Sequence, residues 1–186
     1  IFLKYIKMAE RLHEEFKEIN DNPDNNCGIT VGLVNDSYYD WQITLTAPKD
    51  SYYKGGLFIL RAHFPPDYPI RKPEVFFITP IYHVNVKPTA PKTEGEESLG
   101  HVCISTLNWW NPQYKMKEVL LNIYSLFYMH NPDSAYGTDR AQEYNDKENS
   151  ALYFEKAKLF TKKYADPKNF NNYNNYDRSQ DWDFNL

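Results

Sequence analysis

Residues 28–79 decide the fold class, and they read GITVGLVNDSYYDWQITLTAPKDSYYKGGLFILRAHFPPDYPIRKPEVFFIT. Four runs in this stretch are rich in Val, Ile, Thr, Phe and Tyr, as β-strands are, and clusters of Asp, Gly and Pro separate them. These runs are GITVGLV (28–34), YYDWQITLT (38–46), GGLFILRAHF (55–64) and PEVFFIT (73–79). Because the connections between successive runs are short, the stretch predicts a four-stranded antiparallel meander.

Helical periodicity lies on both sides of this stretch. Residues 3–20 and 115–129 carry apolar side chains at three- and four-residue steps, with charged residues between them. Two more helices are predicted over 138–148 and 149–164. A helix, a meander sheet and then C-terminal helices predict an α+β domain in which one face of the sheet is covered.

Composition limits the class of function. The chain has 186 residues, a formal net charge of -4 and a pI near 5.7. This length suits one domain, which we place at residues 1–165. The mild acidity argues against nucleic-acid binding, and no apolar window is long enough to span a bilayer. Two cysteines are too few for a disulfide scaffold and favour a reduced, intracellular compartment.

After residue 165 the composition changes. Residues 166–186 read DPKNFNNYNNYDRSQDWDFNL, which is rich in Asn and has no usable period. We interpret this stretch as a C-terminal extension whose composition favours disorder. Its spaced aromatic residues leave docking onto the domain as the alternative.

Cys103 lies in a short apolar run and could be a buried filler, a metal ligand or a nucleophile. His101 and His83 are nearby in the sequence, but no second cysteine pair has zinc-ligand spacing, so we predict no metal. His83, Asn85 and Cys103 provide the residue types of a cysteine protease, but the papain-like signature is missing. On spacing alone, a buried small hydrophobe is the best-supported interpretation of Cys103, and it is the one given to Cys27.

An ordered set of motifs around Cys103 resembles the ubiquitin-conjugating enzymes. The motifs are Trp41, DSYYKGGLF (50–58), FPPDYP (64–69), KPEVFFITPIYHVN (72–85), GHVCISTL (100–107), WNP (110–112), KEVLLNIYSLF (117–127) and NPDSA (131–135). The resemblance runs from the first helix to about residue 165. It implies an N-terminal helix, a four-stranded meander, an active-site segment and C-terminal helices, in agreement with the order expected from periodicity.

The resemblance implies catalytic roles for three residues. Cys103 matches the cysteine that accepts the ubiquitin C-terminus as a thioester, and a thiolate is a suitable nucleophile for that step. Asn85 matches the Asn of the His-Pro-Asn motif, which stabilises an oxyanion or orders the adjacent loop. Ser134 falls at a position linked to receiving the substrate lysine, with a plain helix-approach turn as the alternative. His83, with a structural role in the family, and Tyr82 are the supporting residues.

Binding surfaces are implied in the same way. Phe64 and Pro112 lie in the two loops that face ligases, and we expect Phe64 to be an exposed anchor, with packing inside its loop as the alternative. Leu121 lies in the helix that cradles donor ubiquitin. The basic residues of the first helix match the face used by the activating enzyme, although a solvated helix face explains them as well. These residues are Lys4, Lys7 and Arg11.

The resemblance therefore implies a ubiquitin-conjugating transferase. Its expected partners are ubiquitin, the ubiquitin-activating enzyme, a RING- or HECT-type ligase and protein substrates, with no nucleic acid and no membrane. We expect a monomer in the cytoplasm or nucleus that needs no cofactor, since ATP is used by the activating enzyme. The alternatives are a noncatalytic ubiquitin-binding scaffold of the same fold, and a conjugating enzyme for SUMO or another ubiquitin-like modifier.

The sequence departs from the family pattern at several places. Val84 replaces the middle proline of the motif, which removes a fixed backbone angle beside Asn85. Residues 86–100 are longer than the usual turn, and their polar composition predicts an excursion beside the thioester. Gly28 stands where many members carry a Ser on the outer face of the sheet, which weakens the case for noncovalent ubiquitin binding there.

Overall fold

The computed structural model describes residues 2–23, 27–88, 100–136, 138–146 and 150–171, without the side chains of residues 2–8 and 138. The elements are α1 (Phe2–Asp21), β1 (Gly28–Val34), β2 (Ser37–Thr46), β3 (Leu57–His63), β4 (Glu74–Phe77), α2 (Ser105–Asn108), α3 (Met116–Ser125), η1 (Pro132–Ser134), α4 (Thr138–Asn145), α5 (Ser150–Tyr164) and η2 (Pro167–Asn169). The predicted α+β order of helix, strands and helices is confirmed.

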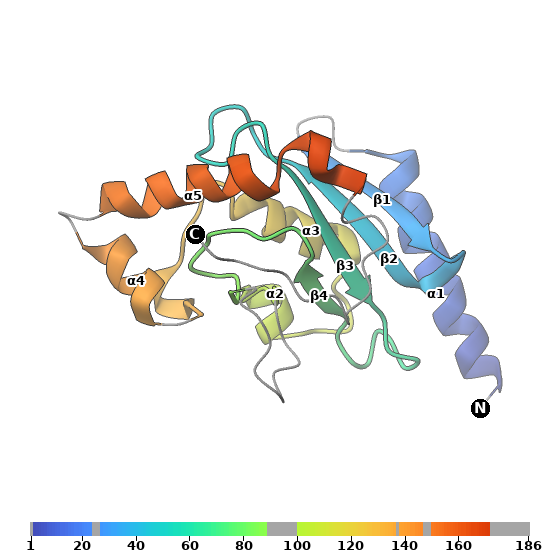
Figure 1. Cartoon of the computed structure of the whole chain (residues 1–186). Helices are drawn as coiled ribbons and strands as arrows, with labels where there is room; N and C mark the ends of the chain where they lie inside the picture. Colours follow the sequence, from blue (N-terminus) through green and yellow to red (C-terminus); the bar gives the residue numbers. More distant parts are fainter. Residues whose placement is uncertain (1, 24–26, 89–99, 137, 147–149, 172–186) are drawn as a thin grey trace, which may run out of the picture.

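The four strands form one antiparallel sheet in the order β1-β2-β3-β4, which is the predicted meander. Asn35 and Asp36 join β1 to β2 with positive φ angles of 50° and 57°, as a two-residue hairpin turn requires. In Figure 1, α1 lies beside β1 and β2 at one end of the molecule, and α4 lies at the opposite end.

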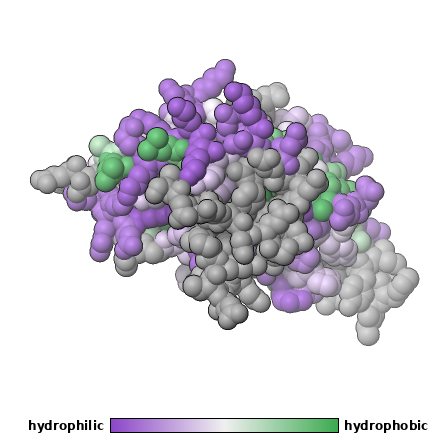
Figure 2. All heavy atoms as spheres, in the orientation of Figure 1, coloured by the Kyte–Doolittle hydropathy of each residue, from purple (hydrophilic) through white to green (hydrophobic). Residues whose placement is uncertain are grey.

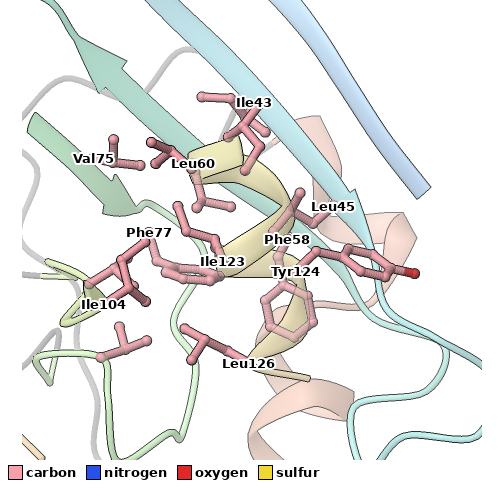
Figure 3. Packing of buried hydrophobic residues seen from close by; sticks show 14 of the residues in the cluster. Ile43, Leu45, Phe58, Leu60, Val75, Phe77, Ile104, Ile123, Tyr124 and Leu126 are labelled. Carbon is pink, nitrogen blue, oxygen red and sulfur yellow. The ribbon is translucent and has the colours of Figure 1, made fainter. Parts of the chain in front are cut away.

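The hydrophobic core lies between the inner face of the sheet and α3. Alternate residues of the strands point inward, because successive side chains of a strand face opposite sides. Figure 3 shows Ile123 and Tyr124 of α3 packed among these side chains. The buried inward-facing residues include Ile43, Leu45, Phe58, Leu60, Val75 and Phe77.

A buried carboxylate joins three separate parts of the chain. Glu15 of α1 is only 4% exposed, and it accepts hydrogen bonds from Arg11 Nε at 2.7 Å and Tyr68 Oη at 2.9 Å. It also accepts from the backbone N–H of Met116 at 2.7 Å, at the start of α3. Burial, and next the Glu15 carboxylate, raise the pKa of Tyr68, so the phenol stays a donor. The loop of Tyr68 is therefore tied to both helices.

The helix predicted over 115–129 ends earlier than its apolar pattern. α3 stops at Ser125, and Leu126 and Phe127 continue in turns whose N–H groups bond to the carbonyls of Ile123 and Tyr124. Leu126 and Phe127 remain buried although they lie outside the helix, so the apolar pattern extends beyond the end of α3. The short α2 has too few residues for a periodic signal, and it was not predicted.

The start of the predicted C-terminal extension docks on the outer face of the sheet. Phe170 packs against Ile59, Phe76 and Ile78, which form an apolar cluster on the face opposite the main core. Residues 172–186 lie outside the described part of the chain.

None of the helices in the described ranges has both the length and the apolar composition needed to cross a bilayer. Most of the coloured surface in Figure 2 is hydrophilic, with small hydrophobic areas near the end where α4 and α5 lie and toward the opposite end.

Candidate active site

The position of Cys103 is set by backbone pairing with the segment that contains Asn85. Val102 forms an antiparallel bridge with Val86, and the N–H of Cys103 donates to the carbonyl of Asn85 at 2.8 Å. The N–H of Lys87 donates to the carbonyl of His101 at 2.9 Å in the same ladder. The Cys103 side chain is half-buried and forms no disulfide, so it is a free thiol.

Gly100 allows this ladder to lie beside β4. Its φ is +73°, and a Cβ there would lie 2.2 Å from the carbonyl oxygen of Phe77. The N–H of Phe77 donates to the Gly100 carbonyl at 2.8 Å. Only glycine combines this angle with so close an approach. Of the long segment predicted at 86–100, both ends are thus anchored, and residues 89–99 lie outside the described residues.

Two side chains that were not predicted from the sequence lie beside Cys103. The Nδ2 of Asn108, an exposed residue of α2, is 3.1 Å from the Sγ of Cys103. Burial, and next the charge of Cys103, raise the pKa of Tyr136. Asn108 follows Cys103 by five residues, and the helical spacing of α2 would have shown their proximity had the helix been predicted.

Asn85 is 1% exposed, and its side chain is fully hydrogen bonded. Its Nδ2 donates to the carbonyls of Asn131 at 2.7 Å and Ser134 at 3.1 Å, and its Oδ1 accepts from the Asn131 N–H at 2.9 Å. Both amide hydrogens therefore bond to the turn at η1. This geometry fits the loop-ordering role better than the oxyanion role, which would require one of these bonds to open.

The three predicted catalytic residues converge on one region. The carbonyl of Ser134 accepts a hydrogen bond from the side chain of Asn85. The N–H of Cys103 donates to the carbonyl of Asn85. The Ser134 side chain is half-buried and its Oγ lies 3.5 Å from Asn131 Nδ2. Asn85 therefore links the segment of Cys103 to the turn of Ser134.

His83 lies behind the site and is fully buried. Its Nδ1 accepts from the N–H of Asn85 at 3.0 Å, and its Nε2 donates to the carbonyl of Leu126 at 3.0 Å. Burial, and next the neighbouring His130, lower the pKa of His83, so the ring is neutral. The rings of His83 and His130 stack at 4.3 Å. Because both nitrogens of His83 bond to backbone, this residue cannot act as the base that a cysteine protease requires.

Tyr82 precedes His83 and is bonded to α4. Its hydroxyl donates to Glu143 Oε2 at 2.6 Å, and burial, followed by this contact, raises the pKa of Tyr82.

Cys27 is half-buried against the hydrophobic core, which matches its interpretation as a packing residue. In the described ranges, no group of three or more His, Cys, Asp and Glu residues could hold a metal ion.

The predicted ligase loops adjoin one another, but Phe64 is not the exposed residue that we expected. It is 1% exposed and packs on Trp41 at 4.6 Å and on Tyr68 at 5.0 Å between ring centroids. The expectation of an exposed anchor at Phe64 is therefore wrong, because this side chain completes the core beneath its loop. Pro112 is exposed, as expected for a surface loop.

Other apolar side chains of the same two loops are exposed. Trp109 is 82% exposed and Ile70 is 55% exposed. The indole Nε1 of Trp110 donates to the carbonyl of Pro69 at 2.7 Å, and Lys72 Nζ donates to the carbonyl of Leu107 at 3.1 Å. These bonds hold the loops together as one surface.

The remaining predicted binding residues lie on α1 and α3. Arg11 has internal contacts, because its Nη2 donates to the carbonyl of Tyr114 at 2.9 Å in addition to its bond with Glu15. Lys4 and Lys7 lie on α1, but their side chains are outside the described part of the structure. Leu121 of α3 is half-buried and lines a small crevice between the end of α1 and the start of β1.

A family model described as ubiquitin-conjugating enzyme matches residues 11–161. The match includes all four strands, the turn at η1 and most of α5. It also contains Cys103, Asn85 and Ser134, which the structure brings together. The residues that the family model matches therefore include those that form the candidate site.

Proposed function

The chain belongs to the ubiquitin-conjugating enzyme family, whose members are transferases that act with ubiquitin, an activating enzyme and a ligase, and we propose that it carries ubiquitin on Cys103. In this proposal, Cys103 accepts the ubiquitin C-terminus as a thioester and passes it to a lysine of a protein substrate. The observation that carries the proposal is a free, half-buried Cys103 whose sulfur lies beside Asn108 and whose N–H bonds to Asn85, which in turn bonds to the turn of Ser134.

The first step is a thioester exchange. The Cys103 thiolate attacks the carbonyl carbon of ubiquitin bound to the activating enzyme, a new S–C bond forms, and the thiolate of the activating enzyme leaves. The amide of Asn108 supports this step, because an N–H donor directed at sulfur stabilises the negative charge. ATP is consumed by the activating enzyme beforehand, and the chain itself uses no cofactor.

The second step is aminolysis. A neutral lysine amine attacks the thioester, the C–N bond forms, the Cys103 S–C bond breaks, and the proton lost by the amine goes to water or to the leaving Cys103 thiolate. Ser134 is too weak a base to take that proton from an ammonium group, so its turn acts by positioning and desolvating the lysine. Asn85 keeps that turn beside Cys103 through its bonds to Asn131 and Ser134.

Partner surfaces follow from exposure. Trp109, Ile70 and Pro112 form the exposed apolar part of the two adjoining loops, which suits a ligase of the RING or HECT type. The α1 helix with its basic residues is the proposed contact for the activating enzyme, and Leu121 is the proposed contact for donor ubiquitin. Arg11 contributes to the first contact only with the part of its guanidinium that its internal bonds leave exposed.

The test is thioester formation on the purified chain. With ubiquitin, activating enzyme and ATP, we expect an adduct that a thiol reductant cleaves. Cys103→Ser should give a more reductant-resistant ester, and Cys103→Ala should give no adduct. Cys27→Ala is the matched control, because it removes the other cysteine, and it should charge like the wild type.

A panel of modifiers in the same assay decides the cargo. Charging with SUMO or another ubiquitin-like protein, and not with ubiquitin, would replace the proposed modifier. An adduct that persists in Cys103→Ala would overturn the assignment of the nucleophile. If no modifier charges Cys103, the transferase proposal fails and a ubiquitin-binding scaffold is the remaining function of this fold.

A further inference from the structure

The backbone beside Asn85 is held by a side chain from a distant helix. Val84 is fully buried, and its N–H donates to the hydroxyl of Tyr153 on α5 at 3.0 Å. Its carbonyl accepts from the N–H of Tyr136 at 2.8 Å. Both polar groups of this buried residue are thus satisfied by parts of the chain far away in sequence.

A second side chain holds the two ends of the same segment. Arg140 of α4 donates from Nη1 to the carbonyls of His83 at 3.2 Å and Val86 at 3.3 Å. These two carbonyls flank Val84 and Asn85, so one guanidinium fixes the path of the backbone on both sides of the asparagine. The planar, rigid group of arginine suits such a bridge better than the single ammonium of lysine.

Arg140 is itself fixed in place by its surroundings. Its guanidinium carbon lies 4.4 Å from the ring centroid of Tyr82, and Tyr82 donates to Glu143 on the next turn of α4. Glu143 Oε1 accepts from Lys156 Nζ of α5 at 2.6 Å, which joins the two helices. Arg140 and Tyr153 therefore belong to one rigid unit against the active-site segment.

Valine at position 84 creates the need for these contacts from Arg140 and Tyr153. Proline would fix φ through its ring and would carry no N–H. Valine leaves φ free and adds a buried donor, which costs free energy unless it finds a partner. Tyr153 supplies that partner, and Arg140 restrains the flanking carbonyls. Hydrogen bonds from α4 and α5 thus take over the restraint that a proline ring would provide.

The restrained segment contacts both Cys103 and the turn of Ser134. Asn85 bonds to Asn131 and Ser134 through its side chain and to the N–H of Cys103 through its carbonyl. A shift of the segment would therefore move the nucleophile relative to the turn that receives the lysine.

We propose that Arg140 and Tyr153 are positioning residues for acyl transfer. They hold the Val84–Asn85 backbone so that Cys103 and the turn of Ser134 keep their relative positions. This inference rests on the proposed function of Cys103. Neither residue touches the reacting atoms; both act through the segment that carries Asn85.

A double-mutant cycle between Tyr153 and Val84 tests the proposal. The measurement is single-turnover discharge of ubiquitin from preformed Cys103 thioester to free lysine, without ligase. Tyr153→Phe should slow discharge about tenfold, because small misplacements of a reacting group cost rates of this order. Tyr164→Phe, which removes another hydroxyl from α5, should not slow it. In a Val84→Pro background, Tyr153→Phe should slow discharge less than about twofold, because the N–H that Tyr153 serves is gone.

An equal slowing in both backgrounds would mean that Tyr153 acts on general stability, and it would overturn the proposal. If Val84→Pro does not fold, Arg140→Met takes its place and should slow discharge about tenfold for the same reason. An Arg140→Met variant with wild-type discharge would also overturn it.

Hydrogen exchange separates this proposal from the function itself, because it needs no thioester. Amides of Val84 and Asn85 should exchange faster in Tyr153→Phe than in the wild type. Unchanged exchange overturns the positioning role even in a chain that charges normally. A wild-type chain that never charges overturns the proposed function instead.

Discussion

The side-chain amide of Asn108 lies 3.1 Å from the sulfur of Cys103. Asn108 ends the four-residue helix α2, which begins two residues after the cysteine. In the proposed reaction the sulfur carries negative charge when it attacks during charging and when it leaves during discharge, and an amide donor at this distance can hydrogen-bond to it in both steps. The short helix therefore places a charge-stabilising group that the family motifs around Cys103 do not include.

We predict that Asn108→Asp slows charging of Cys103 about tenfold at pH 7, because it places a negative charge next to the developing thiolate. Because a neighbouring carboxylate opposes loss of the thiol proton, the charging rate of Asn108→Asp should recover as pH rises. The measurement is the rate of thioester formation from pH 6.5 to 9. Asn145→Asp makes the same charge change at the exposed end of α4 and should have little effect. Identical pH profiles for Asn108→Asp and the wild type would contradict the prediction.

Much of the fold could be predicted because it depends on local patterns. The strand runs within 28–79 and the period of the first helix follow from the alternation of apolar and polar residues, and the structure places elements at both. The end of α3 could not be predicted, because Leu126 and Phe127 keep the apolar period outside the helix. Their burial depends on the sheet, which a local pattern does not contain.

The site was predictable only in part, for a related reason. Cys103, Asn85 and Ser134 were found through motifs, and the structure brings them together. Arg140 and Tyr153 act on residues 57 and 69 positions away, and no local pattern marks such contacts. For Phe64 and similar loop residues, exposure is decided by packing against other elements and not by the polarity of the neighbouring sequence.

A second prediction concerns the buried carboxylate of Glu15. Glu15→Ala should lower the free energy of unfolding by about 3–5 kcal/mol, because it leaves Arg11, Tyr68 and the N–H of Met116 without their shared acceptor. Chemical denaturation measures the loss. Glu14→Ala removes an exposed carboxylate from the same helix and should change stability by less than about 0.5 kcal/mol. Similar values for the two variants would show that the three bonds to Glu15 add no stability.

A third prediction separates the exposed and buried residues of the proposed ligase surface. Trp109→Ala should reduce ligase-stimulated discharge by about tenfold or more, since exposed aromatic anchors dominate such interfaces. It should leave ligase-free discharge and stability near wild type. Phe64→Ala should instead destabilise the chain by about 3–5 kcal/mol, because it empties a core position next to Trp41. Loss of ligase stimulation without loss of stability in Phe64→Ala would reverse these assignments.

The last prediction concerns the stacked imidazoles of His83 and His130. Burial, and next His130, lower the pKa of His83, and burial lowers the pKa of His130 to about 4, against an ordinary value of 6.5. Below pH 6.5 the unfolded chain therefore binds protons that the folded chain does not. By linkage, stability is highest above pH 6.5 and falls as pH decreases toward about 4, by up to about 1.4 kcal/mol per pH unit for each histidine.

The pH dependence can be measured by denaturation between pH 7.5 and 5, where Asp and Glu contribute little. His130→Phe keeps a flat ring between His83 and Tyr144 but cannot bind a proton, so its stability should fall less steeply with pH than that of the wild type. His13→Gln removes an exposed imidazole from α1 and controls for the loss of a histidine. If His130→Phe shows the wild-type slope, the buried ring of His130 is not the source of the acid sensitivity.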